Sequence, residues 1–356
     1  MPDVDPAVVR LIDASLNRAS EGVRVVEDYA RFVLGDGYLS RLAKVLRHGL
    51  SESSATIPFA DRLAARDTPG DVGTRITTDV ETRRADAWEV CVASLQRLQE
   101  ALRSLEEYGK TIDAGLGARF ERLRYDAYTL AKAIGATRRG RERFANVRLY
   151  VLVDGRDSSG ELANFTGSLC EAGVDAIQLR DKSLDDRTLV ERARTLVAAC
   201  RPHGVLSIVN DRPDVAAVAA ADGVHVGQEE LTVADARRIV GANAIVGVST
   251  HAIEQARAAV RDGADYLGVG PTFPTPTKSF DSFPGLDYVH SVADEITLPA
   301  FAIGGVAEMN LPEVLAAGAT RVAVSSAVTA AADPPAAAKR LRDAMDATLR
   351  DAAAEG

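Results

Sequence analysis

A chain of 356 residues is longer than most single domains, so its length favours two domains. Apolar residues make up 46% and charged residues 26%, as in an ordinary globular protein, and the net charge of −9 argues against nucleic acid as the main partner. No apolar run is long enough to cross a bilayer and the N-terminus lacks a secretory pattern, so we expect no membrane partner and a cytoplasmic protein. Cys91, Cys170 and Cys200 are isolated, which is typical of a reducing compartment.

From Pro6 to about Ile134 the apolar residues recur every three or four positions, which predicts helices. We therefore expect an all-helical domain over residues 1–140. This domain contains a repeat, because LNRASEGVRVVEDYAR (16–31) aligns without gaps to LQRLQEALRSLEEYGK (95–110). The charges match at every turn, which favours an internal duplication: two related helical units packed face to face.

The charged residues of each copy share one helix face, and two interpretations of that face stay open. It is either a solvated face with helix ion pairs, each worth about 0.3–0.5 kcal/mol, or the wall of a polar cavity between the copies, closed by the loop 66–75. The side chains proposed for such a site are Asn17, Arg18, Glu21, Arg24, Arg47, His48, Glu100 and Arg103.

The stretch GATRRGRERFAN (135–146) is polar and basic, and we interpret it as a linker that ends with residues 141–146. The second domain is expected at 147–356. Its eight candidate strands lie at 147–153, 174–180, 205–210, 223–227, 244–249, 266–270, 299–305 and 321–326. Ala-rich amphipathic segments fill most gaps, a pattern that indicates parallel strands covered on both faces. Eight such strands in about 200 residues predict a (β/α)₈ TIM barrel, with a doubly wound open sheet as the alternative.

The ends of these strands are polar, and a barrel of this kind carries its active site there. Cations and hydroxyls stand at these ends: Arg180, Lys182, Lys278, Ser249, Ser325 and Ser326. Such groups suit phosphate oxygens. Asp211 and Glu230 form a separated carboxylate pair among them, which suits Mg²⁺ when substrate phosphates complete its shell. A lone Arg at a strand end is more often part of a surface ion pair, but this set recurs at successive strands.

Two histidines and one loop complete the candidates. His225 lies inside an apolar strand and is predicted to be a packed core residue, and His251 follows Ser249 without a nucleophile to pair with. The loop GVGPTFPTPTKSF (268–280) is rich in proline, which pre-sets the backbone. Its hydroxyls and its ammonium group therefore need little ordering when an anion binds.

Seven motifs carry a family resemblance: QLRDK (178–182), VND (209–211), DGVHVGQEEL (222–231), VGVSTH (246–251), DYLGVGPTFPTPTK (265–278), AIGGV (302–306) and VSSAV (324–328). They stand in the order and spacing of thiamin phosphate synthase, which the chain resembles over 147–345. The resemblance implies that an aminopyrimidine-methyl diphosphate is joined to a thiazole monophosphate, that pyrophosphate leaves, and that Mg²⁺ is required. The partners are then small phosphorylated substrates.

The resemblance also implies roles for individual residues. The pyrimidine diphosphate is bound by Gln178, Arg180, Lys182, Asn210, Ser249 and Lys278. The thiazole phosphate is bound by Thr275, Thr277, Gly304, Val324 and Ser325. The metal is held by Asp211 and Glu230, although the family usually has Asp in place of Glu230. A related thiazole-processing barrel, similar to a tautomerase, shares part of the phosphate site and is the alternative.

The helical half resembles a domain found fused ahead of some thiamin phosphate synthases. That domain is associated with making the pyrimidine diphosphate by phosphorylating the monophosphate. No Walker A loop or kinase signature is present here, so a ligand sensor and a structural spacer stay open beside a kinase. Two-domain chains of this sort often associate, which leaves a homo-oligomer open as well.

Overall fold

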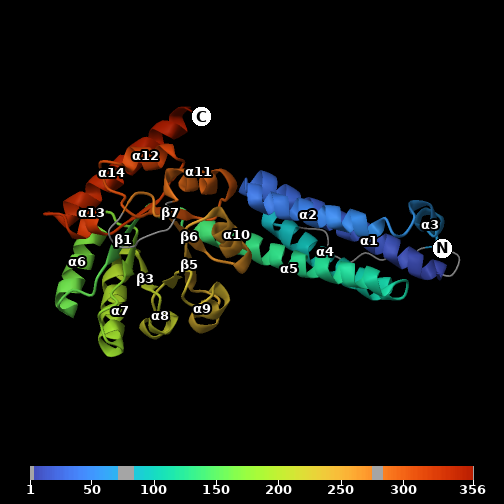
Figure 1. Ribbon diagram of the computed structural model, residues 1–356, viewed down its shortest axis with the longest axis horizontal. Coiled ribbons are helices and arrows are strands. Elements are labelled where there is room, and N and C mark those ends of the chain that lie inside the picture. Colours follow the sequence, from blue (N-terminus) through green and yellow to red (C-terminus); the bar gives the residue numbers. More distant parts are fainter. Residues whose placement is uncertain (1–3, 71–83, 275–283, 356) are drawn as a thin grey trace. The chain divides into compact units, whose positions relative to one another are not determined.

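The computed structural model describes residues 4–70, 84–274 and 284–355. The chain divides into two compact units, residues 1–134 and 135–356. The first is helical and the second is a barrel (Figure 1). No helix in the described part is long and apolar enough to cross a membrane.

The helical unit consists of long helices joined by short turns. Its elements are α1 (Pro6–Asp28), the π-helix η1 (Tyr29–Leu34), α2 (Gly37–Ser54), α3 (Phe59–Ala64), α4 (Ala87–Lys110) and the first part of α5 (Ala114–Arg143). Carboxylates of Asp5, Asp36 and Asp86 accept from backbone N–H groups of the first turns of α1, α2 and α4, which satisfies donors that have no partner within the helix. The first copy of the repeat lies on α1 and the start of η1, the second lies on α4, and α1 and α4 pack directly against each other.

A buried carboxylate ties α4 to α5. Glu106 is 2% exposed and accepts from Arg124 Nε at 2.7 Å, from Arg103 Nη1 at 2.9 Å and from Lys110 Nζ at 3.0 Å. Burial by itself would raise the pKa of Glu106, but hydrogen bonds from Lys110 and Arg124 outweigh it, so the pKa lies below its ordinary value. The ion pairs therefore hold Glu106 charged in the interior of the helical unit.

The barrel closes on itself. Its parallel strands are β1 (Leu149–Val153), β2 (Ala176–Leu179), β3 (Leu206–Asn210), β4 (Gly223–Val226), β5 (Ile245–Thr250), β6 (Tyr266–Val269), β7 (Ala300–Ile303) and β8 (Val322–Val324). They pair in chain order and β8 returns to β1. The predicted (β/α)₈ barrel is confirmed and the open-sheet alternative is excluded, since an open sheet has two free edges.

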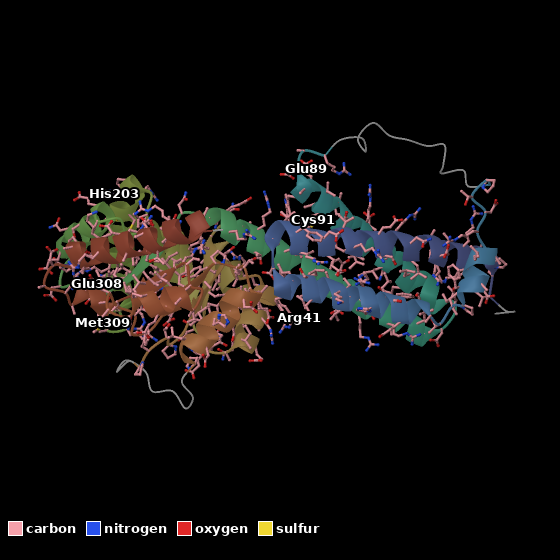
Figure 2. The ribbon with its side chains drawn as sticks, turned by 90° about the horizontal axis from the view of Figure 1, so that it is seen from above. Arg41, Glu89, Cys91, His203, Glu308 and Met309 are labelled. Atoms are coloured by element: carbon pink, nitrogen blue, oxygen red, sulfur yellow. The ribbon has the colours of Figure 1, made fainter. Side chains whose placement is uncertain are left out.

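Helices surround the strands (Figure 1). They are α6 (Ser159–Glu171), α7 (Asp186–Cys200), the 3₁₀ helix η4 (Arg201–His203), α8 (Pro213–Ala219), α9 (Val233–Val240), α10 (Ile253–Asp262), α11 (Gly285–Glu295), α12 (Leu311–Ala316), α13 (Ser326–Thr329) and α14 (Pro334–Glu355). All three cysteines are free and buried, and Figure 2 labels Cys91 on α4. Burial raises the pKa of the Cys91 thiol to about 12, so this thiol stays protonated and unreactive.

The expected linker is helical over most of its length. Helix α5 continues through residues 135–143 and ends at Arg143. Arg138 pairs with Glu142 one turn later at 2.8 Å, and the basic residues of the last turn face the negative end of the helix dipole. The stretch expected as a linker is therefore mostly helical, and its ion pairs and the preceding turns of α5 stabilise it.

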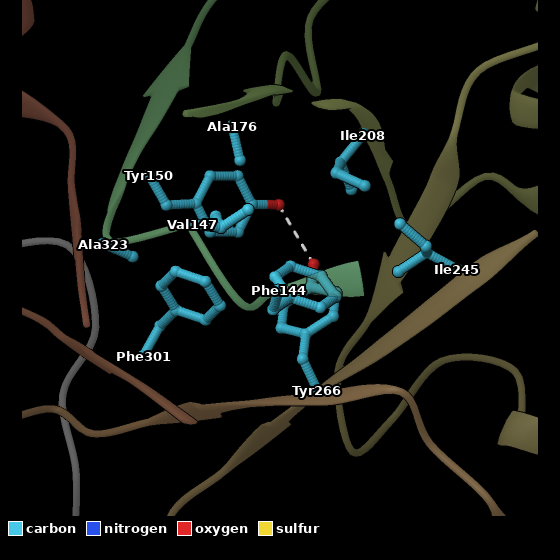
Figure 3. Close-up of a cluster of buried hydrophobic side chains, with 9 residues drawn as sticks. All are labelled: Phe144, Val147, Tyr150, Ala176, Ile208, Ile245, Tyr266, Phe301 and Ala323. Carbon is cyan, nitrogen blue, oxygen red and sulfur yellow. Dashed lines mark hydrogen bonds between the residues drawn. The ribbon is translucent and has the colours of Figure 1, made fainter. Parts of the chain in front are cut away.

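A cluster of buried, largely aromatic side chains fills part of the barrel interior (Figure 3). The cluster comprises Phe144, Val147, Tyr150, Ala176, Ile208, Ile245, Tyr266, Phe301 and Ala323. The Phe144 ring lies 5.0 Å from that of Tyr266 and 5.7 Å from that of Phe301, measured between centroids. The Tyr266 ring has room because residue 247 is glycine: a Cβ there would lie 2.1 Å from Tyr266 Cζ. Glycine at this position is thus a packing requirement.

We expect Gly247→Ala to destabilise the barrel unit by about 1–3 kcal/mol through overpacking. The matched control is Gly167→Ala on α6, where an added Cβ meets nothing within 4 Å. That change should be neutral or should stabilise by up to about 1 kcal/mol, because glycine weakens a helix interior. Urea unfolding followed by circular dichroism measures both. Equal stabilities of the two variants would contradict the assigned packing.

We expect Glu106→Gln to destabilise the helical unit by about 3 kcal/mol, because Arg124 is left buried without its counter-charge. Glu107→Gln is the control, since Glu107 pairs with the same Arg103 and Lys110 but is 48% exposed, and such pairs are worth less than about 1 kcal/mol. The single tryptophan, Trp88, lies against Tyr29 in this unit, so its fluorescence reports the transition.

The same pair of variants tests the pH dependence. A lowered folded-state pKa stabilises above the unfolded-state pKa, about 4.3 for Glu, and this contribution is lost as the pH falls below it. The wild type should therefore lose stability in that window, whereas Glu106→Gln should lose markedly less. An identical acid profile would show that Glu106 is not held charged.

Candidate active site

A cavity of about 520 Å³ opens at the carboxyl ends of the barrel strands. Seven of the predicted site residues line it: Gln178, Arg180, Asn210, Ser249, Gly304, Val324 and Ser325. They come from β2, β3, β5, β7 and β8 or from the residues that follow these strands. The parallel strands thus bring residues that are far apart in sequence to one opening. Thr275, Thr277 and Lys278 lie outside the described residues.

Two carboxylates and a lysine meet beside this cavity. Lys182 Nζ lies 3.0 Å from Asp211 Oδ2 and 3.9 Å from Glu230 Oε1. Asp211 follows the cavity residue Asn210 and has a left-handed backbone with φ of 61°, which is uncommon for a residue with a side chain. Its N–H donates to the carbonyl oxygen of His225 at 2.8 Å, which helps to hold this conformation. Strain of this kind is characteristic of functional sites.

The carboxylate pair fits a hard divalent cation. The Lys182 ammonium lies within ion-pair distance of both carboxylates, so a positive charge is accommodated beside Asp211 and Glu230 together. Within the described ranges no group of three or more His, Cys, Asp or Glu side chains could hold a metal. Two carboxylates are the set that Mg²⁺ commonly uses when substrate phosphates and water complete its shell.

The glycine pair after β7 shapes the opposite end of the cavity. Gly304 and Gly305 have φ of 95° and 69°, and a Cβ on Gly304 would lie 2.7 Å from the Cα of Pro271. Here the start of the proline-rich loop is fixed: Thr272 N–H donates to the Ile303 carbonyl and Phe273 N–H to the Gly304 carbonyl, both at 2.9 Å. The residues before Thr275 are therefore anchored to the end of β7.

Five polar side chains are linked across the barrel beneath the cavity, and we call them the floor chain: Gln178, Tyr150, Tyr266, His225 and Ser249. Gln178 Nε2 donates to Tyr150 Oη at 2.7 Å, and Tyr150 Oη lies 3.0 Å from Tyr266 Oη (Figure 3). Tyr266 Oη lies 2.9 Å from His225 Nδ1, and His225 Nε2 lies 2.8 Å from Ser249 Oγ. Burial raises the pKa of both tyrosines well above the ordinary value, so both stay protonated.

The sequence analysis missed the two tyrosines and undervalued both histidines. His225 is 7% exposed, as a packed residue would be, but it also lines the cavity and has two polar partners. His251 lines the cavity too, and its Nδ1 lies 2.5 Å from the carbonyl oxygen of Gly270. Strand parity was the signal that could have found the tyrosines, because Tyr150 and Tyr266 point the same way as Gln178 and Ser249 on neighbouring strands.

The polar residues proposed for the helical unit lie at its surface. Seven of them are exposed: Asn17, Arg18, Glu21, Arg24, His48, Glu100 and Arg103. Arg47 is half-buried and pairs with Glu27 at 2.8 Å. Their exposure fits the interpretation of a solvated face, and half of the loop that was expected to close over a cavity, residues 71–75, lies outside the described ranges. A site on this surface therefore stays a prediction.

Two family models match the chain. The model described as thiamine monophosphate synthase matches residues 149–328, and the one described as the ThiD2 family matches residues 10–133. A thiamine-phosphate synthase of Rhodopirellula baltica is 46% identical over 90% of this chain and 88% of that protein. One of Synechocystis is 40% identical over 94% of this chain and 95% of that protein.

A solved structure agrees over the barrel. The thiamine phosphate pyrophosphorylase from Pyrococcus furiosus is 36% identical, with a TM-score of 0.52, and the match covers 57% of this chain and 97% of that one. The two full-length relatives extend over both units, and the family model and the solved structure cover the barrel that holds the cavity. The chain therefore belongs to the thiamine monophosphate synthase family.

Proposed function

We propose that the barrel unit joins an aminopyrimidine-methyl diphosphate to a thiazole monophosphate, giving thiamin phosphate and pyrophosphate. The observation that carries this proposal is the cluster of Lys182, Asp211 and Glu230 beside a cavity that Arg180 lines. Cations stabilise a diphosphate and carboxylates hold its metal ion, and a site for one monophosphate needs no such set. The cluster therefore favours the synthase over a thiazole tautomerase.

The reaction needs charge stabilisation more than proton transfer. The bond between the methylene carbon and the diphosphate oxygen breaks, its electron pair leaves with pyrophosphate, and the thiazole nitrogen lone pair forms the new C–N bond. Arg180 and Lys182 would stabilise the charge that develops on the leaving group, and the resemblance assigns the same role to Lys278. Mg²⁺ held by Asp211 and Glu230 would neutralise further charge on the diphosphate oxygens. The thiazole nitrogen carries no proton, so no general base is required.

The remaining roles follow from position in the cavity for the described residues and, for Thr275 and Thr277, from the resemblance alone. Gln178 and Ser249 on the floor, with Asn210, would bind the pyrimidine, and Gly304, Val324 and Ser325 would bind the thiazole phosphate together with Thr275 and Thr277. Orientation of the two substrates in one cavity replaces an encounter in solution, and such pre-ordering lowers barriers by up to about 7–11 kcal/mol.

We expect Asp211→Asn and Glu230→Gln each to lower turnover at limiting Mg²⁺ by at least about tenfold, that is about 1.4 kcal/mol. Both should also raise the Mg²⁺ concentration needed for half-maximal rate. Glu229→Gln is the matched control, because Glu229 is exposed beside Glu230 and forms no ion pair with Lys182. If both variants kept the wild-type dependence on Mg²⁺, Asp211 and Glu230 would not be the metal ligands. That result would favour the tautomerase alternative.

For the helical unit we propose the supply of the pyrimidine diphosphate from the monophosphate and ATP. The support is its match to a family model of its own, separate from that of the barrel. A ligand sensor and a structural spacer are the alternatives that the next experiment must separate from a kinase.

We expect the full chain to make thiamin phosphate from pyrimidine monophosphate, ATP, thiazole phosphate and Mg²⁺. A truncation to 135–356, which keeps the end of α5 with the barrel unit, should make it only from preformed diphosphate. Circular dichroism checks that the truncated barrel is folded. If the full chain also requires preformed diphosphate, the helical unit is a sensor or a spacer, and ligand-binding calorimetry distinguishes these two.

A further inference from the structure

The second copy of the repeat carries a complete set of ion pairs, which we call the closed cluster. Arg103 lies 2.9 Å from Glu106 and 3.0 Å from Glu107, and Lys110 lies 3.0 Å from each of them. Arg124 Nε on α5 lies 2.7 Å from Glu106 Oε2. Every charged group of this cluster therefore has a partner within the protein.

The first copy of the repeat carries the same charges at the equivalent positions. Arg24, Glu27, Asp28 and Arg31 align with Arg103, Glu106, Glu107 and Lys110. The helix that follows each copy also supplies an arginine, because Arg47 Nε on α2 lies 2.8 Å from Glu27 Oε2, as Arg124 Nε on α5 does from Glu106. The duplication thus includes the same glutamate–arginine contact. We call these five residues of the first copy and α2 the open cluster.

The open cluster leaves most of its charges without partners. Among the described residues the contact between Arg47 and Glu27 is its only ion pair. Arg24, Asp28 and Arg31 are exposed, and the Glu27 side chain is 21% exposed where its equivalent in the closed cluster is 2% exposed. A face that served only to join helices would be paired as in the closed cluster, so the first copy differs in use as well as in structure.

The backbone explains why Arg31 is unpaired. The π-helix η1 begins at Tyr29, and hydrogen bonds between residues five apart widen its turn. Arg31 therefore leaves the position one regular turn after Glu27, and its guanidinium carbon lies 4.8 Å from the centroid of the Phe32 ring. The second copy is a regular α-helix to its end. Short π-helical segments occur frequently at functional sites, which favours a role for the first copy.

The residue types of the open cluster suit phosphate. All three of its cations are arginines, whereas the closed cluster has Lys110 in place of Arg31. A planar guanidinium group presents two parallel N–H donors that match a pair of phosphate oxygens, and an ammonium group lacks this geometry. The seven residues from Arg24 to Arg31 rise by about 10 Å, and Arg47 contacts Glu27 between them. The three arginines therefore stand within reach of one phosphorylated ligand.

We propose that the open cluster is the phosphate-binding surface of the helical unit, where Arg24, Arg31 and Arg47 bind a phosphate group of the ligand. The closed cluster is its structural counterpart and binds no ligand. The identity of the ligand rests on the proposed supply of the pyrimidine diphosphate, for which ATP and the pyrimidine monophosphate are the substrates. Both offer the same phosphate chemistry, and the experiment distinguishes them.

The test compares Arg24→Gln and Arg31→Gln with the equivalent changes Arg103→Gln and Lys110→Gln in the second copy. Glutamine keeps part of the side-chain stem and removes the charge in all four variants. Calorimetry on the full chain titrates ATP with Mg²⁺ in one arm and the pyrimidine monophosphate in the other. Urea unfolding followed by the fluorescence of Trp88 measures the stability of the helical unit.

We expect both first-copy variants to raise the Kd of at least one ligand by at least about tenfold. Their urea midpoints should stay unchanged, because both arginines are exposed and unpaired in the described structure. The second-copy variants should lower the urea midpoint, because Glu106 loses a counter-charge, and should leave both Kd values within about twofold. Equal losses of binding in the two copies, no loss in the first copy, or no binding of either ligand by the wild type would overturn the proposal.

Failure of the proposed kinase activity is recognised separately. If the full chain consumes no ATP, the kinase proposal is overturned, and calorimetry still tests the open cluster as the ligand site of a sensor. If both first-copy variants consume ATP with the wild-type rate and KM, the kinase proposal stands and the open cluster is not its phosphate site.

Discussion

A closed parallel barrel must fill its own interior, and most of this site follows from how that is done. Eight strands enclose a space that side chains have to occupy, because a void would lose dispersion contacts on every side. Aromatic rings fill part of this interior, and the cavity lies above them at the carboxyl ends of the strands, partly lined by the same rings. Tyr150 and Tyr266 lie between the two. Their rings pack in the aromatic cluster, and their hydroxyl groups form part of the floor chain. The core therefore determines where the floor of the cavity lies.

Charge is distributed by the same geometry. Parallel strands place their carboxyl ends at one opening, so cations and carboxylates from different strands meet without any local sequence motif. Lys182 follows β2, Asp211 follows β3 and Glu230 follows β4, and the three converge beside the cavity. In the helical unit, by contrast, most charges stay on the solvated side, and the buried Glu106 is held by three cations. Ion pairs thus have different roles in the two units. In the barrel they lie beside the cavity, and in the helical unit they join helices.

Much of the barrel could be read from the sequence because its strands are short, apolar and regularly spaced. Each observed strand lies within its expected range or extends beyond it by one residue, as Thr250 does on β5. Residues at strand exits were found because polarity there contrasts with apolar strands. The floor chain was not found, because His225, Tyr150 and Tyr266 stand inside strands where a polar tip looks like packing. The helical structure of the stretch 135–143 was not foreseen, because apolar periodicity does not reveal a helix stabilised by ion pairs and by its own preceding turns.

The continuity of α5 has a consequence for how this chain can vary. A segment without regular structure accepts added or missing residues, because no packing depends on its register. A helix turns by about 100° for each residue, so one insertion between Gly135 and Arg143 would rotate Phe144 away from the rings it meets in the barrel. Insertions and deletions in this stretch should therefore destabilise the barrel unit far more than substitutions do. Relatives that carry both units should keep its length while its residue types vary.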